Sequence, residues 1–244
     1  MIRAATMLAA FRAAPFAELG AVTGGGPILV LAPHPDDESL GFGGTIAAAV
    51  AGGIAVHIVV LTDGTGSHPG SRRYPPPRLK MLREAETCAA AATLGVAAEQ
   101  VAFLEAVDSH APTEGADFDA LTHRLAGMIA RVQARSLLTT WRHDPHCDHE
   151  AAALLGAAAA QAAGVRFLTA PVWGWTLPDD APLPDPLPAA IRLDVAAYLP
   201  AKRRAIAAHV SQTTGLIDDS PDRFRLDPAF LALFDRPWEV LIPS

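Results

Sequence analysis

The sequence predicts an α/β fold in which a parallel β-sheet carries helices on both faces. Short apolar runs bounded by turn-forming residues recur at 28–31, 56–61, 101–104 and 136–141, and a fifth begins at 165. Runs of this kind are typical of strands that are buried on both faces. Helical segments separate them, and this alternation places parallel strands in one sheet through right-handed crossovers. We therefore expect a Rossmann-like architecture.

Hydrophobic spacing and turn residues define the helices between these strands. Residues 45–51 and 78–94 are expected to be helical, and residues 34–44 to form a loop. Phe118, Leu121, Leu125, Met128 and Val132 recur at the spacing of an amphipathic helix. Asp148 is expected to cap an Ala-rich helix that ends near Gly164.

The C-terminal part of the chain is less regular. Residues 178–188 are rich in proline and predict an irregular surface loop. Residues 191–193 alternate like an edge strand, 195–210 look helical, and 238–242 predict a final strand. No repeat and no clear boundary divides the chain, so residues 1–244 are expected to form a single domain.

Composition argues against two classes of partner. The formal net charge is -7 and the densest basic runs, 72–73 and 202–204, are short, which argues against a nucleic-acid binder. The longest uncharged apolar stretch, 151–165, is too short to span a bilayer. The two cysteines, Cys88 and Cys147, do not make a disulfide framework. We expect a soluble, cytoplasmic protein.

Two short segments concentrate metal-binding and acid–base side chains. His34-Pro35-Asp36-Asp37-Glu38 follows the first strand, and His143-Asp144-Pro145-His146-Cys147-Asp148-His149 follows the fourth. If the strands take the doubly wound order 3-2-1-4-5, the two segments face each other across one crevice at the carboxyl ends of strands 1 and 4.

A catalytic zinc takes three ligands from His, Asp or Glu and keeps one position open, and this crevice offers two imidazoles, a carboxylate and a spare carboxylate. For any one of these residues alone a structural role is the favoured explanation, since Asp148 fits a helix cap and His34 a loop. Both clusters at adjacent strand ends favour a cation.

At these residues the chain resembles the PIG-L/LmbE-like de-N-acetylases. Residues 33–38 match the first motif of that family, and residues 144–149 match the second, with Cys147 where proline is common. Weaker similarity extends over about 27–212. The resemblance implies zinc, with Fe²⁺ as an alternative, held by His34, Asp37 and His149. It further implies that Asp36 is the general acid/base and that His146 holds the oxyanion.

The remaining site residues are less specific. Asp148 is expected to orient His146 or to cap its helix, and a protonated His146 would stabilise the oxyanion. We expect substrate contacts from Arg83, Asp108 and His209, although an ion pair or a place inside a helix accounts equally well for the first and the last. Trp141, Trp173 and Trp175 fit either stacking on a sugar or packing.

The sequence thus predicts a hydrolase that removes an N-acetyl group from an N-acetylglucosamine-like sugar or conjugate, using metal-bound water. The expected partner is a small N-acetylated molecule. A homo-oligomeric protein is also compatible with the sequence. One alternative is hydrolysis of another N-acyl amide. A second is a non-catalytic nucleotide-binding module, which the acidic residues 36–38 disfavour because they would repel a pyrophosphate.

Overall fold

The computed structural model describes residues 1–184 and 186–243; Asp185 and Ser244 lie outside the described residues. The strands of its main sheet are β2 (Phe16–Ala17), β3 (Ile28–Ala32), β4 (Val56–Thr62), β5 (Val101–Ala106), β6 (Ser136–Thr140), β7 (Arg166–Ala170), β9 (Ile191–Asp194) and β10 (Trp238–Pro243). The helices are α1 (Ala4–Ala13), α2 (Leu19–Thr23), α3 (Asp37–Ala51), α4 (Pro76–Thr93), α5 (Gly115–Arg131), α6 (Cys147–Ala163), α7 (Leu199–Ala208), α8 (Val210–Thr213) and α9 (Pro228–Ala232). Two short strands, β1 (Ile2–Arg3) and β8 (Pro182–Leu183), pair apart from the main sheet.

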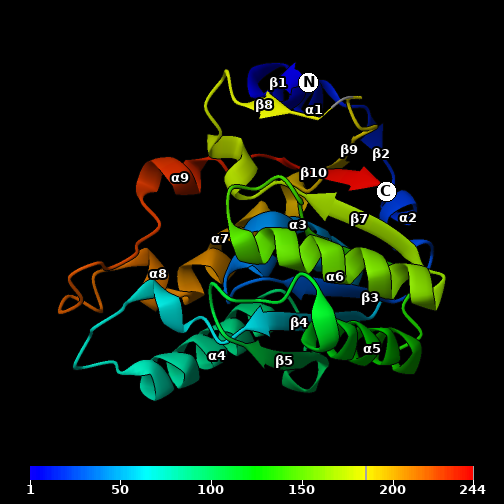
Figure 1. The fold of residues 1–244 in the computed structure, drawn as a ribbon. Coiled ribbons are helices and arrows are strands. Elements are labelled where there is room, and N and C mark those ends of the chain that lie inside the picture. The colour runs from blue at the N-terminus through cyan, green and yellow to red at the C-terminus, as the bar shows by residue number, and fades with distance from the viewer. Residues whose placement is uncertain (185, 244) are drawn as a thin grey trace.

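The strand order of the main sheet confirms the doubly wound prediction. It runs β2-β9-β10-β7-β6-β3-β4-β5, so the five parallel strands have the predicted order 3-2-1-4-5 (Figure 1). β3 pairs with β4 on one side and with β6 on the other. Beyond β7 the sheet continues through β10, which is antiparallel to both β7 and β9. β9 was expected at the edge but is covered by β2.

Alternate residues of the central strands supply two separate cores, as a strand buried on both faces requires. Ile28 and Val30 of β3 pack in a cluster with residues of α3, α4 and α7. Leu29 and Leu31 point the other way, into a cluster with residues of α5 and α6. Helices therefore cover both faces of the sheet, as predicted (Figure 1).

The prediction of a loop over residues 34–44 is wrong from Asp37 onward, because α3 begins there. The glycines that suggested a loop allow close packing of this helix instead. A Cβ on Gly44 would lie 2.6 Å from the Cβ of Val195, and one on Gly43 would lie 2.9 Å from Lys202 Cγ. Only glycine lets α3 approach the C-terminal segment this closely.

Three other boundaries differ from expectation. Helix α6 begins at Cys147 with His146 as its N-cap, so Asp148 is not the cap. The helix expected over 195–210 is broken into α7 and α8 at His209. Within 178–188, expected to be irregular, residues 182–183 form β8, and Asp185 lies outside the described residues. Among the described helices, none is both long and apolar enough to cross a membrane.

Candidate active site

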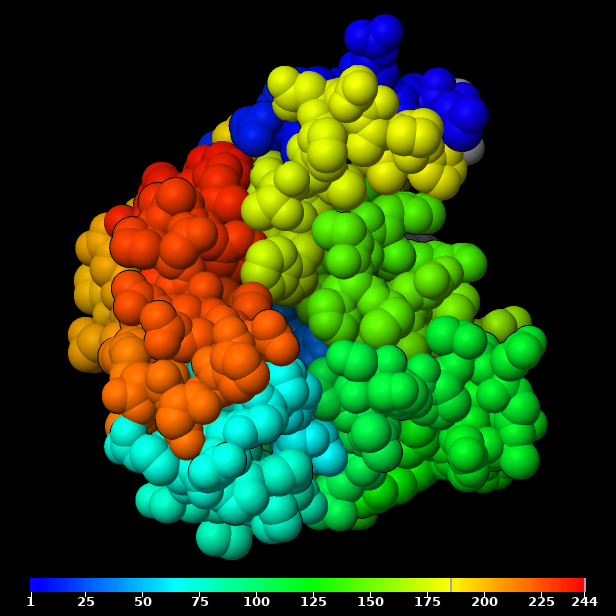
Figure 2. Space-filling view, turned by 60° about the vertical axis from the view of Figure 1, so that its left-hand side comes forward, coloured from blue at the N-terminus to red at the C-terminus, as the bar shows by residue number. Residues whose placement is uncertain are grey.

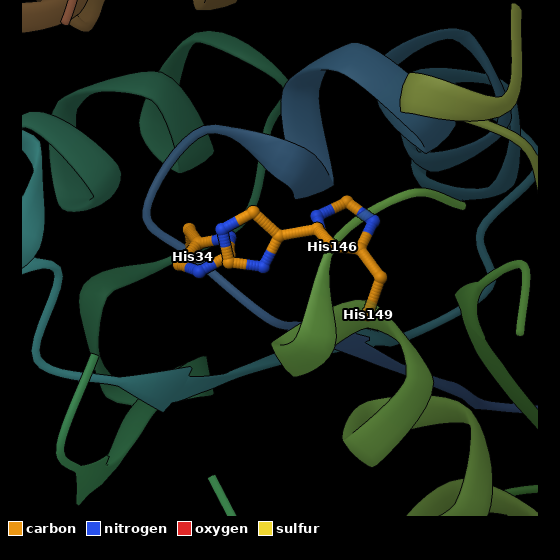
Figure 3. Close-up of side chains that lie close together, drawn as sticks. All are labelled: His34, His146 and His149. Atoms are coloured by element: carbon orange, nitrogen blue, oxygen red, sulfur yellow. The ribbon is translucent and has the colours of Figure 1, made fainter. Parts of the chain in front are cut away.

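The segments that follow β3 and β6 meet at the carboxyl end of the sheet. Pro33 and Pro35 flank His34 and end strand β3, and α3 then begins at Asp37. An acidic first turn suits the positive end of this helix. The ring centroid of His34 lies 4.5 Å from that of His146 and 5.4 Å from that of His149, so three imidazoles from two segments converge (Figure 3).

Asp37 lies between two of these imidazoles. Its Oδ2 is 3.2 Å from His34 Nδ1 and 3.3 Å from His149 Nε2. Ligand atoms placed about 2.05 Å from a tetrahedral zinc are ~3.3 Å apart, so these separations fit a shared ion. His149 Nε2 is buried and makes no regular hydrogen bond, although it lies within ion-pair distance of Asp37 Oδ2. Three other groupings of possible ligand atoms lie within 4.8 Å of one another: His34 with His146 and His149, His146 with Cys147 and Asp148, and His34 with Asp108 and Asp148.

A carboxylate stands behind each of the two histidines that face Asp37. His149 Nδ1 lies 2.9 Å from Asp144 Oδ2, and His34 Nε2 lies 3.0 Å from Asp148 Oδ2. Each carboxylate thus assigns a proton to the ring nitrogen beside it, Nδ1 of His149 and Nε2 of His34. The other nitrogen of each ring, which faces Asp37, is then left to bind a cation. Asp148, which was expected to orient His146, therefore orients His34.

Backbone amides fix both carboxylates. Asp144 accepts hydrogen bonds from the N–H groups of Val172, Trp173 and Gly174 at 2.7–3.1 Å. Asp148 accepts from Ser109 at 2.7 Å and from Ala111 at 3.1 Å. The loops after β5 and β7 therefore hold the carboxylates that hold the imidazoles.

The charges of this cluster depend on one another. Burial alone would lower the pKa of His34, but Asp148 and Asp37 raise it to about 9. Burial would also lower the pKa of His149, but Asp37 and Asp144 outweigh it and raise this pKa to about 10. Against its own burial, the pKa of Asp37 is lowered by His149 and His34. Without an ion, two imidazolium groups thus face the carboxylates of Asp37, Asp144 and Asp148.

Asp36 occupies a strained backbone conformation. Its φ of 146° is rare for any residue other than glycine. Its N–H donates to Glu38 Oε2 at 3.1 Å, and Arg83 Nη2 donates to Pro35 O at 2.6 Å and to Asp36 Oδ2 at 3.3 Å. Although Asp36 is at the N-cap position of α3, its side chain makes no capping bond. Asp36 therefore does not serve as a side-chain cap of this helix.

The pKa of Asp36 is raised to about 7. Burial is the main cause, the neighbouring Asp37 adds to it, and Arg83 works against it. A carboxylate with a pKa near neutrality exchanges a proton readily in either direction.

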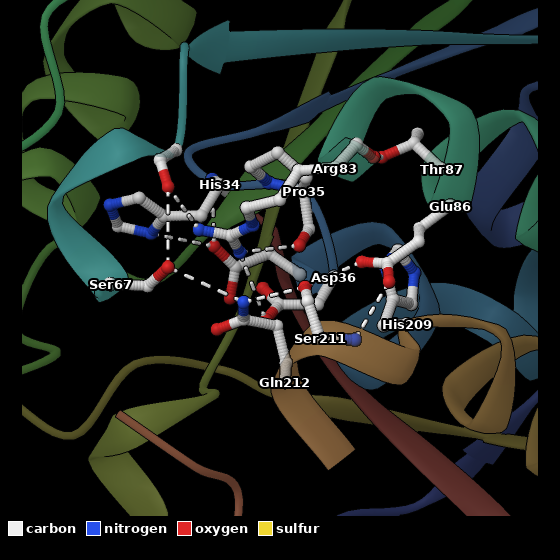
Figure 4. Close-up of polar contacts among 12 residues, drawn as sticks. His34, Pro35, Asp36, Ser67, Arg83, Glu86, Thr87, His209, Ser211 and Gln212 are labelled. Carbon is white, nitrogen blue, oxygen red and sulfur yellow. Dashed lines mark hydrogen bonds and ion pairs between the residues drawn. The ribbon is translucent and has the colours of Figure 1, made fainter. Parts of the chain in front are cut away.

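Behind Asp36 lies a second layer of buried polar contacts (Figure 4). Glu38 Oε1 is 2.8 Å from His209 Nε2 and accepts from Ser39 Oγ at 2.7 Å. Glu86 accepts from the N–H and hydroxyl of Ser211 at 2.7 and 2.6 Å. His209 is fully buried and does not line the cavity, so the predicted substrate contact gives way to support of Glu38.

A cavity of about 150 Å³ opens above these groups. Figure 2 shows its mouth as a hollow between cyan, orange and green parts of the chain, with blue atoms at its floor. The lining residues are His34, Asp36, Asp37, Leu40, Gly66, Ser67, Arg83, Asp108, Ser109, His146, Trp173, Gln212, Phe224 and Leu226. The predicted residues Arg83, Asp108 and His146 thus face the cavity, whereas Asp148 and His149 lie behind it.

His146 is placed to donate a hydrogen bond as a neutral ring. Its Nδ1 accepts from the N–H of Asp148 at 3.2 Å, so the proton is on Nε2. Burial and the nearby charges of His34 and His149 lower its pKa. The expectation of a protonated His146 is therefore corrected to a neutral donor.

Sequence reasoning missed several residues of this site. Asp144 and Glu38 were in the quoted segments, but nothing in the sequence distinguishes a carboxylate behind a ligand from the ligand itself. Phe224 and Leu226 of the apolar wall lie in an irregular C-terminal segment whose path the sequence does not predict. Of the three tryptophans considered for stacking, Trp173 alone lines the cavity. Trp141 and Trp175 are buried in a core cluster with α1.

Comparisons with known proteins show which family the chain is similar to. The sequence pattern of the PIG-L family, described as GlcNAc-PI de-N-acetylase, matches residues 29–160, more than half of the chain. A 1D-myo-inositol 2-acetamido-2-deoxy-alpha-D-glucopyranoside deacetylase of Rhodococcus opacus (strain B4) is 27% identical, and the match covers 77% of this chain and 82% of the relative.

Solved structures share the fold. The N,N'-diacetylchitobiose deacetylase from Pyrococcus horikoshii has a TM-score of 0.69 at 20% identity, and the match covers 93% of this chain and 87% of that one. The A40926 pseudoaglycone deacetylase Dbv21 has a TM-score of 0.66 at 22% identity, with 89% and 96% covered. The 4-carboxy-2-hydroxymuconate hydratase GalB of Pseudomonas putida KT2440 also matches, with a TM-score of 0.56 at 25% identity and 75% and 78% covered.

Proposed function

The chain belongs to the PIG-L family of GlcNAc-PI de-N-acetylases, and we propose that it is a zinc-dependent hydrolase that removes an N-acetyl group from an N-acetylglucosamine-like sugar or sugar conjugate. One observation carries this proposal. Asp37 Oδ2 lies 3.2–3.3 Å from a nitrogen of His34 and one of His149, with a carboxylate of raised pKa, Asp36, beside them.

The ion would be held by His34, Asp37 and His149. When bound, zinc, or Fe²⁺ in its place, polarises the amide carbonyl and makes water a better nucleophile at neutral pH. Asp144 and Asp148 act through the ligands, because they fix the two rings that bind it.

Asp36 transfers the proton. In its ionised form it accepts a proton from the attacking water as the oxygen adds to the acetyl carbon. It then gives this proton to the amide nitrogen as the C–N bond breaks, so that the products are acetate and an amine. Arg83 keeps the carboxylate in place through Pro35 O and Asp36 Oδ2.

His146 stabilises the charge that develops on the acetyl oxygen. His146 lines the cavity together with His34, and its Nδ1 accepts a hydrogen bond from the N–H of Asp148, so its Nε2–H is available as a neutral donor. Arg83 and Asp108 also line the cavity and are proposed to contact the substrate. We further propose that the protein is a single domain and acts in the cytoplasm.

Two other activities remain as outcomes of the test. Hydrolysis of another N-acyl amide would use the same groups with a different substrate pocket. A nucleotide-binding module is disfavoured, because buried Asp36, Asp37 and Glu38 at the start of α3 repel the phosphates that a helix N-terminus would otherwise attract.

The direct experiment is acetate release from N-acetylated compounds by the zinc-loaded protein. The panel contains N-acetylglucosamine, its inositol and aryl glycosides, N,N'-diacetylchitobiose, and N-acetyl amino acids as non-sugar amides. We expect release from the sugars, abolished by a chelator and restored by zinc. Release from the N-acetyl amino acids alone would change the proposed substrate class from sugars to other N-acyl amides. No release by fully zinc-loaded protein would refute hydrolysis of these amides.

A further inference from the structure

Trp173 is the one tryptophan, among residues 1–184 and 186–243, that lines the candidate active-site cavity. We infer that Trp173 is a stacking platform for the pyranose ring of the substrate, with Gln212 as a hydrogen-bond acceptor beside it. This inference rests on the proposed function and concerns which groups of the substrate are recognised, whereas the metal and the acid/base decide the chemistry.

The indole is held rigidly by its surroundings. Phe230 stacks on it with ring centroids 4.2 Å apart and planes 25° apart, and Phe224 meets it edge-on at 5.8 Å. Phe230 is itself buried, so one indole face is covered by protein, while Trp173 remains half-buried and reaches the cavity. An aromatic ring fixed in this way loses little entropy when a ligand packs on it.

A single carboxylate ties this platform to the proposed metal ligands. Asp144 Oδ2 accepts the backbone N–H of Trp173 at 3.1 Å and the Nδ1–H of His149 at 2.9 Å. The indole and the imidazole are therefore positioned by the same oxygen atom. A sugar that packs on Trp173 is placed at a fixed offset from the ion, as near-attack geometry requires.

The rest of the lining matches a pyranose, which has an apolar C–H face and a polar edge. Leu40, Phe224 and Leu226 continue the apolar wall. Gln212 also lines the cavity and is fully buried, yet its Oε1 has no hydrogen-bond partner (Figure 4). A buried acceptor left unpaired costs stability, so a hydroxyl or amide N–H of the substrate is its natural partner.

The location of these residues in the sequence supports a role in selectivity. The family match ends at residue 160. The proposed ligands and the acid/base lie inside it, whereas Trp173, Gln212 and Phe224 lie outside. The chemistry is thus provided by the shared part of the chain, and the wall that meets the substrate by the part that the family pattern does not match.

The test compares a substrate that has a ring face with one that has none. We would measure kcat/KM for N-acetylglucosamine and for N-acetylethanolamine in the wild type, Trp173→Ala, Trp173→Phe and the control Trp238→Phe, a half-buried tryptophan on β10. The ratio of the two values should fall about tenfold or more in Trp173→Ala and recover partly in Trp173→Phe. Zinc content should stay unchanged. An unchanged ratio in Trp173→Ala would overturn the assignment.

Binding of the product provides a readout that does not need turnover. Glucosamine should change the tryptophan fluorescence of the wild type and of Trp238→Phe but much less that of Trp173→Phe. If the wild type releases no acetate but shows this pattern, the proposed reaction fails and the platform stands. If glucosamine causes no change in the wild type, or an equal change in Trp173→Phe, the platform fails whatever the activity.

Discussion

Glu38 accepts a hydrogen bond at 3.1 Å from the backbone N–H of Asp36, which holds Asp36 at a φ of 146°. A conformation of this kind costs of order 1–3 kcal/mol and persists only where the surroundings enforce it. Here Glu38 holds one side of the residue, and Arg83 holds the carbonyl of the preceding peptide. The strain aims the Asp36 carboxylate into the cavity rather than at the start of α3.

Replacing Glu38 by Gln should therefore impair catalysis as well as stability. The amide loses its charge-assisted contact with His209 and holds Asp36 N–H less firmly. We expect kcat to fall about tenfold or more with a smaller change in KM, together with a loss of ~1–3 kcal/mol in the free energy of unfolding. The matched control is Glu86→Gln, a buried carboxylate bonded to Ser211, which should lose stability but keep kcat. Equal losses of kcat in both variants would contradict this account.

The adjacent carboxylates Asp36 and Asp37 should separate by phenotype. Asp36→Asn keeps its shape but loses the base, so the rate should fall by ~10²–10⁴ while zinc remains bound. Asp37→Asn loses a charged ligand, so zinc content should fall and excess zinc should restore part of the activity. Metal analysis and acetate release, measured side by side, decide the matter. Loss of zinc in Asp36→Asn with retention in Asp37→Asn would reverse the two roles.

The sequence predicts the parallel core of this fold well and its periphery poorly. Strands β3, β4, β5, β6 and β7 are short runs rich in apolar residues and threonine between turn residues, and the doubly wound order considered for them is the observed one. The strands at 191–193 and 238–242 are predicted, but the antiparallel pairing of β10 with β7 and β9 is not, because pairing between segments distant in sequence leaves no local signal.

The same contrast holds for the site. The convergence of His34 with His149 was predictable, because both follow strands that are neighbours in the sheet. The contact of Asp148 with His34, in place of the expected one with His146, is not predictable from the sequence. It depends on the amides of Ser109 and Ala111 in another loop. The start of α3 at Asp37 is not predicted, because its glycines resemble loop residues in the sequence but allow packing against Val195 and Lys202 in the structure.

The rate should depend on pH through Asp36. Its pKa is raised to about 7, and a base must be ionised, so kcat/KM should rise with pH on the acid limb and level off above that pKa. A bound cation adds attraction for the carboxylate, so the limb of the zinc enzyme should lie above the ordinary range of Asp and no higher than about 7. Arg83→Gln removes a charge that lowers this pKa and should move the limb to higher pH. A pH–rate profile with the same acid limb in both proteins would argue against Asp36 as the base.

Asp144 should matter for metal affinity although it is not a proposed ligand. Asp144→Asn weakens the bond that orients His149, and losses of this kind typically cost ~10–100-fold in affinity. Zinc affinity is measured by competition with a chelator. The control is Asp219→Asn, an exposed carboxylate bonded to Ser71 and the amides of Arg72 and Arg73. Wild-type affinity in Asp144→Asn would show that this carboxylate only anchors the loop after β7.

Zinc binding should release protons, because the raised pKa values of the two proposed histidine ligands keep both rings protonated near pH 7 in the ion-free protein. The pKa of His34 is about 9 and that of His149 about 10, whereas only neutral imidazoles bind a metal. Near pH 7 each ion should therefore displace about two protons, and affinity should rise about 100-fold per pH unit. Below about pH 9 the zinc affinity should therefore rise with pH, since higher pH removes the competing protons.

Calorimetric titration in two buffers with different heats of ionisation counts these protons directly. His146→Ala is the matched control, because burial and the charges of His34 and His149 lower the pKa of His146 and leave it no proton to release at neutral pH. This variant should keep the proton count of the wild type, whereas His149→Ala should lower both the count and the affinity. A release of less than one proton per ion in the wild type would mean that zinc is not bound by this pair of histidines.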